Sequence, residues 1–295
     1  MNRIWESGKG EALVQGNIDE AEALEMVSTI GDTIKFKAIP RSECPPRLEA
    51  LPLPRSNALS LPARLVIAEP NPFNENAASY VMVQCLGTSE REHVLAELVS
   101  AIVQEPFYND LRTKQQLGYI VSSGLRGVGE SRTISFIVQS SVAPAESLTV
   151  SILAFLDSVE ETLLKKIPKA DLAVYAKSIF DRKTEPDKDL TTEVTRNWSE
   201  ISSGRLQFDR LQQEAAALLD IEKDEVLDFW RRVYAGNGRR VLITEMVPRQ
   251  GKASSDDPLT STRYTANRLD QEGLTLGIDD IQQFRSDREK AMVSS

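Results

Sequence analysis

The sequence predicts an α+β fold in which an antiparallel or mixed sheet carries helices packed on one face. Three observations lead to this expectation. Segments rich in Val and Ile alternate apolar and polar residues, the long middle stretch repeats its apolar residues with helical period, and the order is strands, helices, hairpin, helical block and closing strand. With 41% hydrophobic and 27% charged residues in 295, the chain has an ordinary globular composition.

The N-terminal region predicts one strand and one helix without a core of their own. The apolar run Ala12–Gln15 is typical of a short strand, Gly16-Asn17 of a turn, and Asp19 to about Thr29 of a helix. Proline then becomes too dense for helix interiors or regular strand ladders. We therefore separate a strand-helix segment, 1–38, from a proline-rich linker, 39–62.

A regular pattern begins after the linker. Arg64–Ala68 and Ser79–Leu86 predict two strands of one sheet, and the apolar residues of Glu90–Val103 have helical spacing. Pro106 is expected at the first turn of a further helix that runs to about Leu117. Gly118 is expected to end that helix as a C-cap with positive φ.

The second half predicts a hairpin, a helical block and a last strand. Tyr119–Val128 and Arg132–Ser140 are the hairpin strands, joined around Gly127-Val128-Gly129. Helices are expected at Leu148–Leu164, Asp171–Asp181, Leu190–Ile201 and Val226–Tyr234, and the closing strand at Val241–Met246. We take 63–250 as one α+β domain and 251–295 as a polar C-terminal tail with a short final segment, Ile278–Phe284.

Charge and cysteine content narrow the partners and the compartment. The formal net charge of −9 has the wrong sign for broad contact with nucleic acid. No apolar run is long enough for a membrane span, and no secretory signal opens the sequence. Cys44 and Cys85 cannot form a disulfide framework, and Cys85 is expected to pack as a small hydrophobe. These features favour a cytoplasmic protein that binds neither nucleic acid nor membrane.

Local motifs supply no complete catalytic machinery. His93 and Glu97 have the i, i+4 spacing of helical metal ligands, but the chain has no second histidine, so both side chains are expected to point to solvent and no metal is assigned. No nucleophile elbow surrounds a serine or cysteine. The glycines at 124, 127 and 129 precede no phosphate-binding helix.

One motif is distinctive. The segment Phe107-Tyr108-Asn109-Asp110-Leu111-Arg112-Thr113-Lys114-Gln115-Gln116-Leu117-Gly118-Tyr119 joins a helix to a strand and resembles the C-terminal half of insulysin-like enzymes of the pitrilysin family. Val14-Gln15-Gly16-Asn17 is similar to the end of that family's third domain, 106–236 to its fourth domain, and Ile278–Phe284 to its final segment. The resemblance covers most of the chain.

The resemblance implies a zinc metallopeptidase whose related α+β domains enclose peptide substrates in a chamber. The family's zinc motif, His-x-x-Glu-His, lies in the N-terminal half, and nothing in this chain matches it. Arg112 and Tyr119 match the family signature and are the implied ligands of the substrate and transition state. Their guanidinium and phenol donors suit an oxyanion. Gly118 is assigned a structural role.

Considered without the resemblance, the same residues have simpler interpretations. Arg112 is more typical of a surface ion pair with Asp110 or another carboxylate, and Tyr119 of a half-buried strand residue. Trp198 and Trp230 are expected in the core because their neighbours are apolar at helical spacing.

The function predicted is the substrate-binding C-terminal portion of an insulysin-like zinc metalloendopeptidase. It is not expected to hydrolyse peptides alone, and zinc and its ligands would belong to the N-terminal catalytic half or subunit. The alternative is a stand-alone, non-catalytic scaffold that pairs with a separate catalytic subunit. A third interpretation, a structural subunit without peptide contact, would make the pairing of Arg112 with Tyr119 accidental.

Overall fold

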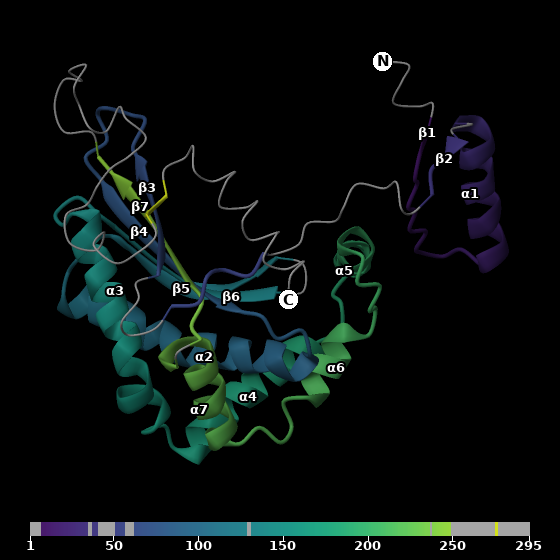
Figure 1. Ribbon diagram of the computed structural model, residues 1–295. Coiled ribbons are helices and arrows are strands. Elements are labelled where there is room, and N and C mark those ends of the chain that lie inside the picture. Colours follow the sequence, from purple (N-terminus) through teal and green to yellow (C-terminus); the bar gives the residue numbers. More distant parts are fainter. Residues whose placement is uncertain are drawn as a thin grey trace. The chain divides into compact units, whose positions relative to one another are not determined.

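A computed structural model describes residues 7–34, 37–40, 51–56, 62–128, 131–236, 238–248 and 275–276 (Figure 1). The chain divides into two compact units. One combines Met1–Leu48 with Thr184–Leu211, and the other combines Glu49–Lys183 with Gln212–Ser295. The division places a segment of the middle of the chain with the N-terminal region, which the sequence pattern did not indicate.

The smaller unit is built around two helices. The helix α1 (Glu20–Ile34) is longer than expected. The short strand β1 (Ser7–Gly8) precedes it in the sequence, the short strand β2 (Lys37–Ala38) follows it, and the two strands pair in parallel. The predicted strand at Ala12–Gln15 is wrong, because these residues form no ladder. Instead the Gln15 side chain accepts a hydrogen bond of 3.0 Å from Asn197 on α5 (Leu190–Ser203).

The larger unit contains a six-stranded mixed sheet, which confirms the expected fold class. Its strand order is β5-β6-β4-β7-β3-β8. The antiparallel members are β4, β5 and β6, whereas β7 pairs in parallel with β3 and antiparallel with β4. The strands are β3 (Ala63–Ala68), β4 (Ala77–Cys85), β5 (Ile120–Val128), β6 (Ser131–Ser140), β7 (Val241–Val247) and β8 (Thr275–Leu276). The final segment predicted at 278–284 lies outside the residues that the structure describes.

Helices of this unit lie on one side of the sheet (Figure 1). Three of them continue directly into π-helical segments, in which the backbone bonds widen to i→i+5. The helices are α2 (Glu90–Tyr108) with η3 (Asn109–Lys114), α3 (Ala145–Val159) with η4 (Glu160–Leu164), α4 (Lys169–Thr184), α6 (Arg210–Ala216), and α7 (Lys223–Trp230) with η5 (Arg231–Ala235). The helix α6 was not anticipated.

Pro106 does not begin a new helix as predicted but lies inside α2. Proline removes one backbone donor, at a cost of about 3 kcal/mol in a helix interior. The apolar residues Val103, Phe107 and Leu111 continue across it at i, i+4 and i+8, and all three are fully buried. Burial of such side chains stabilises by about 1.5–3 kcal/mol each, so core packing carries the helix through the proline.

Aromatic and aliphatic side chains fill the space between sheet and helices. Phe107 meets Phe136 and Phe155 edge to face, with ring centroids 5.1 and 5.2 Å away. Trp230 is fully buried and stacks on Tyr234, which confirms its predicted place in the core. Trp198, on α5, is 42% exposed, so the corresponding prediction is wrong.

Cys85 also packs as expected. It is buried in the core cluster, and burial raises the pKa of its thiol to about 12. The thiol is therefore protonated and unreactive at neutral pH.

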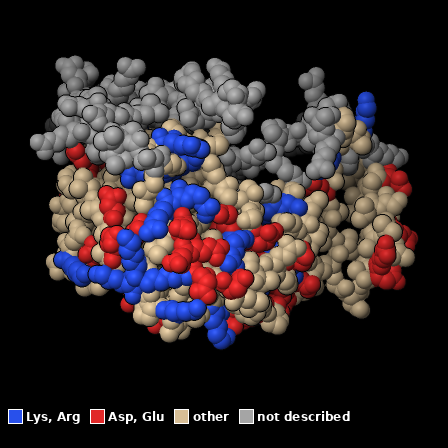
Figure 2. Space-filling model, turned by 60° about the horizontal axis from the view of Figure 1, so that its bottom comes forward, with Lys and Arg blue, Asp and Glu red and all other residues tan. Residues whose placement is uncertain are grey.

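Basic and acidic side chains alternate over the helical face of the larger unit (Figure 2). Arg91, for example, contacts Asp220 at 2.6 Å and Glu225 at 2.5 Å. On this face the positive and negative side chains are therefore interspersed, although the chain as a whole has a net negative charge. None of the described helices is long and apolar enough to cross a membrane.

Candidate functional site

The candidate site lies where α2 and η3 end and β5 begins. Leu111 is fully buried and anchors η3 to the core, while the next residue, Arg112, is half-buried. The π-helical geometry is visible in the hydrogen bond from the Gln115 N–H to the Asp110 carbonyl, 3.0 Å. Short π segments within helices are often found at functional sites, because they redirect side chains that an α-helix would place elsewhere.

The chain changes direction between Arg112 and β5, and two residues, Gln116 and Gly118, make this possible. Gln116 adopts a left-handed conformation with φ of 53°. Gly118 has no positive φ, contrary to the prediction. Its role is close approach instead, because a Cβ atom there would lie 1.9 Å from the carbonyl oxygen of Gln139 on β6. The structural assignment of Gly118 thus has a different physical basis from the one expected.

The reversal brings Arg112 and Tyr119 together. The Arg112 guanidinium carbon lies 5.8 Å from the centroid of the Tyr119 ring, within the range of a cation–π contact. Tyr119 is 87% exposed, so it is not the half-buried strand residue that its position suggested. A large aromatic side chain this exposed is available to a ligand.

Arg112 also lacks the ion pair proposed from its sequence neighbours. The Asp110 carboxylate accepts a hydrogen bond from Gln115 at 3.0 Å and lies 3.9 Å from the Lys114 ammonium. Among the residues that the structure describes, no carboxylate pairs with Arg112. The pair therefore presents a cation with several fixed donors beside a phenol hydroxyl, a set that can bind a polarised carbonyl oxygen.

His93 and Glu97 do not point to solvent, so this expectation is wrong. His93 is buried, and its Nδ1 lies 3.3 Å from Glu214 on α6. The Lys183 ammonium lies 2.7 Å from both the Glu97 and the Glu214 carboxylates, and the Arg132 guanidinium lies 3.6 Å from Glu214. The sequence could not reveal this, because the partners of α2 lie on β6, α4 and α6, far along the chain.

The cluster has the chemistry of a buried ion network. An ammonium group occupies the space between two carboxylates, where a divalent cation would otherwise be attracted. Within the described part of the chain, no group of three or more His, Cys, Asp or Glu residues is arranged to hold a metal ion. The described residues thus do not fit a zinc site.

Comparisons with known proteins agree with the resemblance. Residues 98–198 match the family model described as "PQQ synthase PqqF-like, C-terminal lobe domain 4". The chain is 31% identical to human insulin-degrading enzyme over 232 residues, which are 78% of this chain and 22% of that protein. The chain is homologous to the C-terminal portion of M16 peptidases.

Two further proteins are similar to this chain over most of its length. Human nardilysin is 29% identical over 260 residues, 85% of this chain and 22% of nardilysin. A crystal structure of pitrilysin superposes with a TM-score of 0.71 at 18% identity, covering 91% of this chain and 26% of pitrilysin, which shows a shared fold. The chain thus spans about a fifth of the length of the two curated relatives.

We predict that Gly118→Ala destabilises the larger unit by about 1–3 kcal/mol, because the new methyl group would overlap the Gln139 carbonyl and force the segment before β5 away from β6. Urea unfolding monitored by tryptophan fluorescence measures the change. Gly124→Ala, on the strand β5 that follows Gly118, is the matched control, since a Cβ there meets nothing within 4 Å. Equal stability of the two variants would contradict the close-approach role.

A second prediction concerns the buried ion network. Lys183→Met should cost about 3–5 kcal/mol of unfolding free energy, because it leaves two carboxylates without their central cation. Lys177→Met, on the same helix, removes only an exposed pair with Asp181 and should cost about 0.5 kcal/mol or less. The comparison uses chemical denaturation at pH 7. A loss below about 1 kcal/mol for Lys183→Met would show that the network is not stabilising.

Proposed function

We propose that this chain is the substrate-binding C-terminal portion of an insulysin-like zinc metalloendopeptidase. The observation that carries the proposal is the contact between Arg112 and Tyr119 at the exposed start of β5. Zinc chemistry would come from the N-terminal catalytic half or subunit, since the described residues of this chain contain no metal-binding group. We also propose that the chain divides into the segments predicted from the sequence, with boundaries after residues 38, 62 and 250.

Arg112 and Tyr119 would act on the peptide carbonyl that undergoes attack. The guanidinium offers a fixed positive charge, and the phenol donates one hydrogen bond in its neutral form. Both interactions strengthen as the carbonyl oxygen becomes an oxyanion, so they stabilise the transition state more than the bound substrate. The ring contact restricts the guanidinium, which lowers the entropy lost when it binds.

The smaller unit supports a role within a larger assembly. Helix α1 has no buried residue, and Leu24, Val27 and Ile30 repeat at i, i+3 and i+6 with at least 41% exposure each. Such an apolar stripe is typical of a helix that packs on another surface. We assign that surface to the remainder of the peptidase.

The alternative is a stand-alone binding or scaffold protein that pairs with a separate catalytic subunit. One observation favours it: the fold superposes on a "peptidase M16 inactive domain" from Pseudomonas fluorescens with a TM-score of 0.52 and 14% identity. The size of the native polypeptide distinguishes the two. A blot with an antibody against residues 60 to 250 would show a band well above 32.8 kDa for the peptidase and near 32.8 kDa for the scaffold.

In the assembled enzyme, we predict that Tyr119→Phe lowers kcat on the order of 100-fold and raises KM by much less, because the hydroxyl bond forms fully only with the oxyanion. Steady-state kinetics on a peptide substrate measure both constants. Tyr175→Phe, a partly buried tyrosine packed against the core, is the control and should leave kcat unchanged. Unaltered kinetics for Tyr119→Phe, with zinc content equal to wild type, would refute the assigned role.

A further inference from the structure

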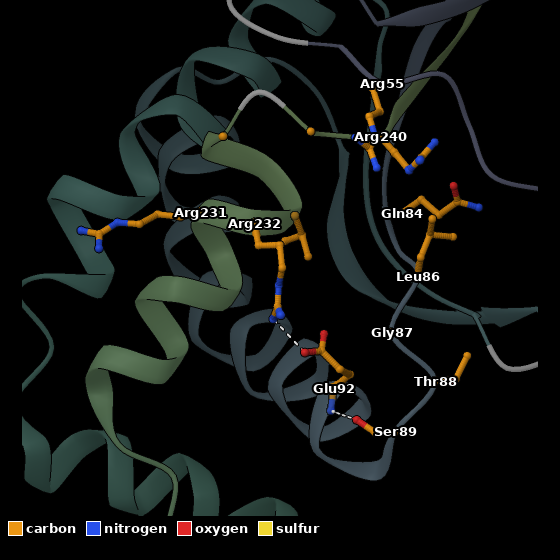
Figure 3. Close-up of a pocket in the computed structure, with 13 residues that line it drawn as sticks. Arg55, Gln84, Leu86, Gly87, Thr88, Ser89, Glu92, Arg231, Arg232 and Arg240 are labelled. Atoms are coloured by element: carbon orange, nitrogen blue, oxygen red, sulfur yellow. Dashed lines mark hydrogen bonds and ion pairs between the residues drawn. The ribbon is translucent and has the colours of Figure 1, made fainter. Parts of the chain in front are cut away.

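A hollow of about 770 Å³ lies at the opposite end of α2 from Arg112 and Tyr119 (Figure 3). It forms where β4 ends, α2 begins and η5 leads toward β7. The lining consists of Arg55, Gln84, Leu86, Gly87, Thr88, Ser89, Glu92, Arg231, Arg232, Val233, Gly236, Gly238 and Arg240. Neither the sequence pattern nor the proposed function accounts for it.

Arginine dominates the charge of this lining, although the chain as a whole is acidic. Four arginines and a single carboxylate, Glu92, line the hollow. Arg231 points away from it (Figure 3) and binds Glu160 at 2.7 Å. Arg232 points toward the base of the hollow and pairs with Glu92 at 2.8 Å.

Arg55 and Arg240 lie on the wall opposite Arg232 and Glu92 (Figure 3). Within the described part of the chain, no hydrogen bond or ion pair holds the exposed Arg55 guanidinium. Three guanidinium groups thus surround a space that contains one carboxylate. The guanidinium groups repel one another in this shared hollow, and an anion bound between them would be attracted to all of them.

Backbone contacts fix this wall in place. The Arg240 guanidinium donates to the Leu53 carbonyl, and the Gln84 amide bridges the Leu53 N–H at 2.8 Å and the Leu51 carbonyl at 3.0 Å. The Ser56 N–H donates to the Arg239 carbonyl at 2.8 Å. Arg55 therefore lies on a segment that is held at Leu53 and Ser56, which preorganises its position.

The N-terminus of α2 adds further positive partial charge to the hollow. Ser89 is the N-cap and accepts a hydrogen bond from the Glu92 N–H, so the positive end of a 19-residue helix lies at the base of the hollow. Gly87 lets the chain pass close to Glu92, since a Cβ at that position would lie 2.4 Å from the Glu92 Cγ. The hydroxyls of Thr88 and Ser89 belong to the lining.

We propose that this hollow binds the phosphate group of a small phosphomonoester. Guanidinium groups from separate segments can surround a tetrahedral group and donate to several of its oxygens. An excess of more than one positive charge suits a dianion better than a single carboxylate. The volume exceeds what one phosphate ion fills, which leaves room for an organic part against Leu86 and Val233. The concave shape of the hollow and the net negative charge of the whole chain do not suit a nucleic-acid duplex.

Isothermal titration calorimetry on the full protein tests this, with glycerol 3-phosphate, inorganic phosphate and acetate as probes at low ionic strength. We expect glycerol 3-phosphate to bind more tightly than inorganic phosphate, and acetate to bind at least tenfold more weakly than either. Arg55→Gln should weaken glycerol 3-phosphate binding about tenfold, since one charge-assisted contact is worth about 1.5 kcal/mol or more. Arg55 has no described partner, so this variant should fold normally.

Arg126→Gln is the matched control, because Arg126 is also exposed and belongs to the same unit but lies on β5 outside the lining. It should leave every affinity unchanged. The proposal is overturned if no phosphate probe binds, if acetate binds as tightly as glycerol 3-phosphate, or if Arg126→Gln weakens binding as much as Arg55→Gln. Inorganic phosphate binding as tightly as the ester would refute the place assigned to the organic part.

Discussion

The packing of α2 against the sheet is the constraint on which the other features depend. Val103, Phe107 and Leu111 stay fully buried along one line, and this burial outweighs the backbone bond that Pro106 removes. Because the helix is fixed by its apolar side, the features next to it have defined positions: the arginine-lined hollow at its start, the buried ion network along its first half, and Arg112 just beyond its end.

Two buried ionic contacts hold the elements around this helix in one arrangement. Lys183 joins α4 to α2 and α6, and Arg64 on β3 pairs with Glu245 on β7 at 2.5 Å with both side chains almost inaccessible. Glu245 also accepts a hydrogen bond from Thr149 on α3. Such pairs contribute little net stability relative to apolar packing, but a displaced element would leave a charge unpaired in the interior. They therefore penalise alternative packings more than they stabilise the native one.

The sequence predicted the fold class and most strands because period and alternation are local properties. It failed where a distant residue decides. Local signals favour Pro106 as a helix start, because the free energy gained by burying Phe107 against the sheet does not show in the local sequence. The sequence favours a positive φ at Gly118, whereas position 118 requires glycine because a carbonyl oxygen on β6 lies too close for a Cβ atom. Local pattern places His93 in solvent, since its buried partner Glu214 lies 121 residues away in the sequence. The choice of Arg112 and Tyr119 depends on a family signature rather than on local pattern, and the structure shows that the chain reversal brings the two side chains into contact.

The π-helical segments at the ends of α2, α3 and α7 have a consequence for comparing relatives. Where the backbone changes from i→i+4 to i→i+5 bonding, the helix accommodates an additional residue per turn, so the periodicity of inward-facing side chains shifts from that point on. A homologue without the wide turn would need one residue fewer between Phe107 and Tyr119 to keep both in register. Alignments of this helix should therefore place a gap at the π segment rather than in the following loop.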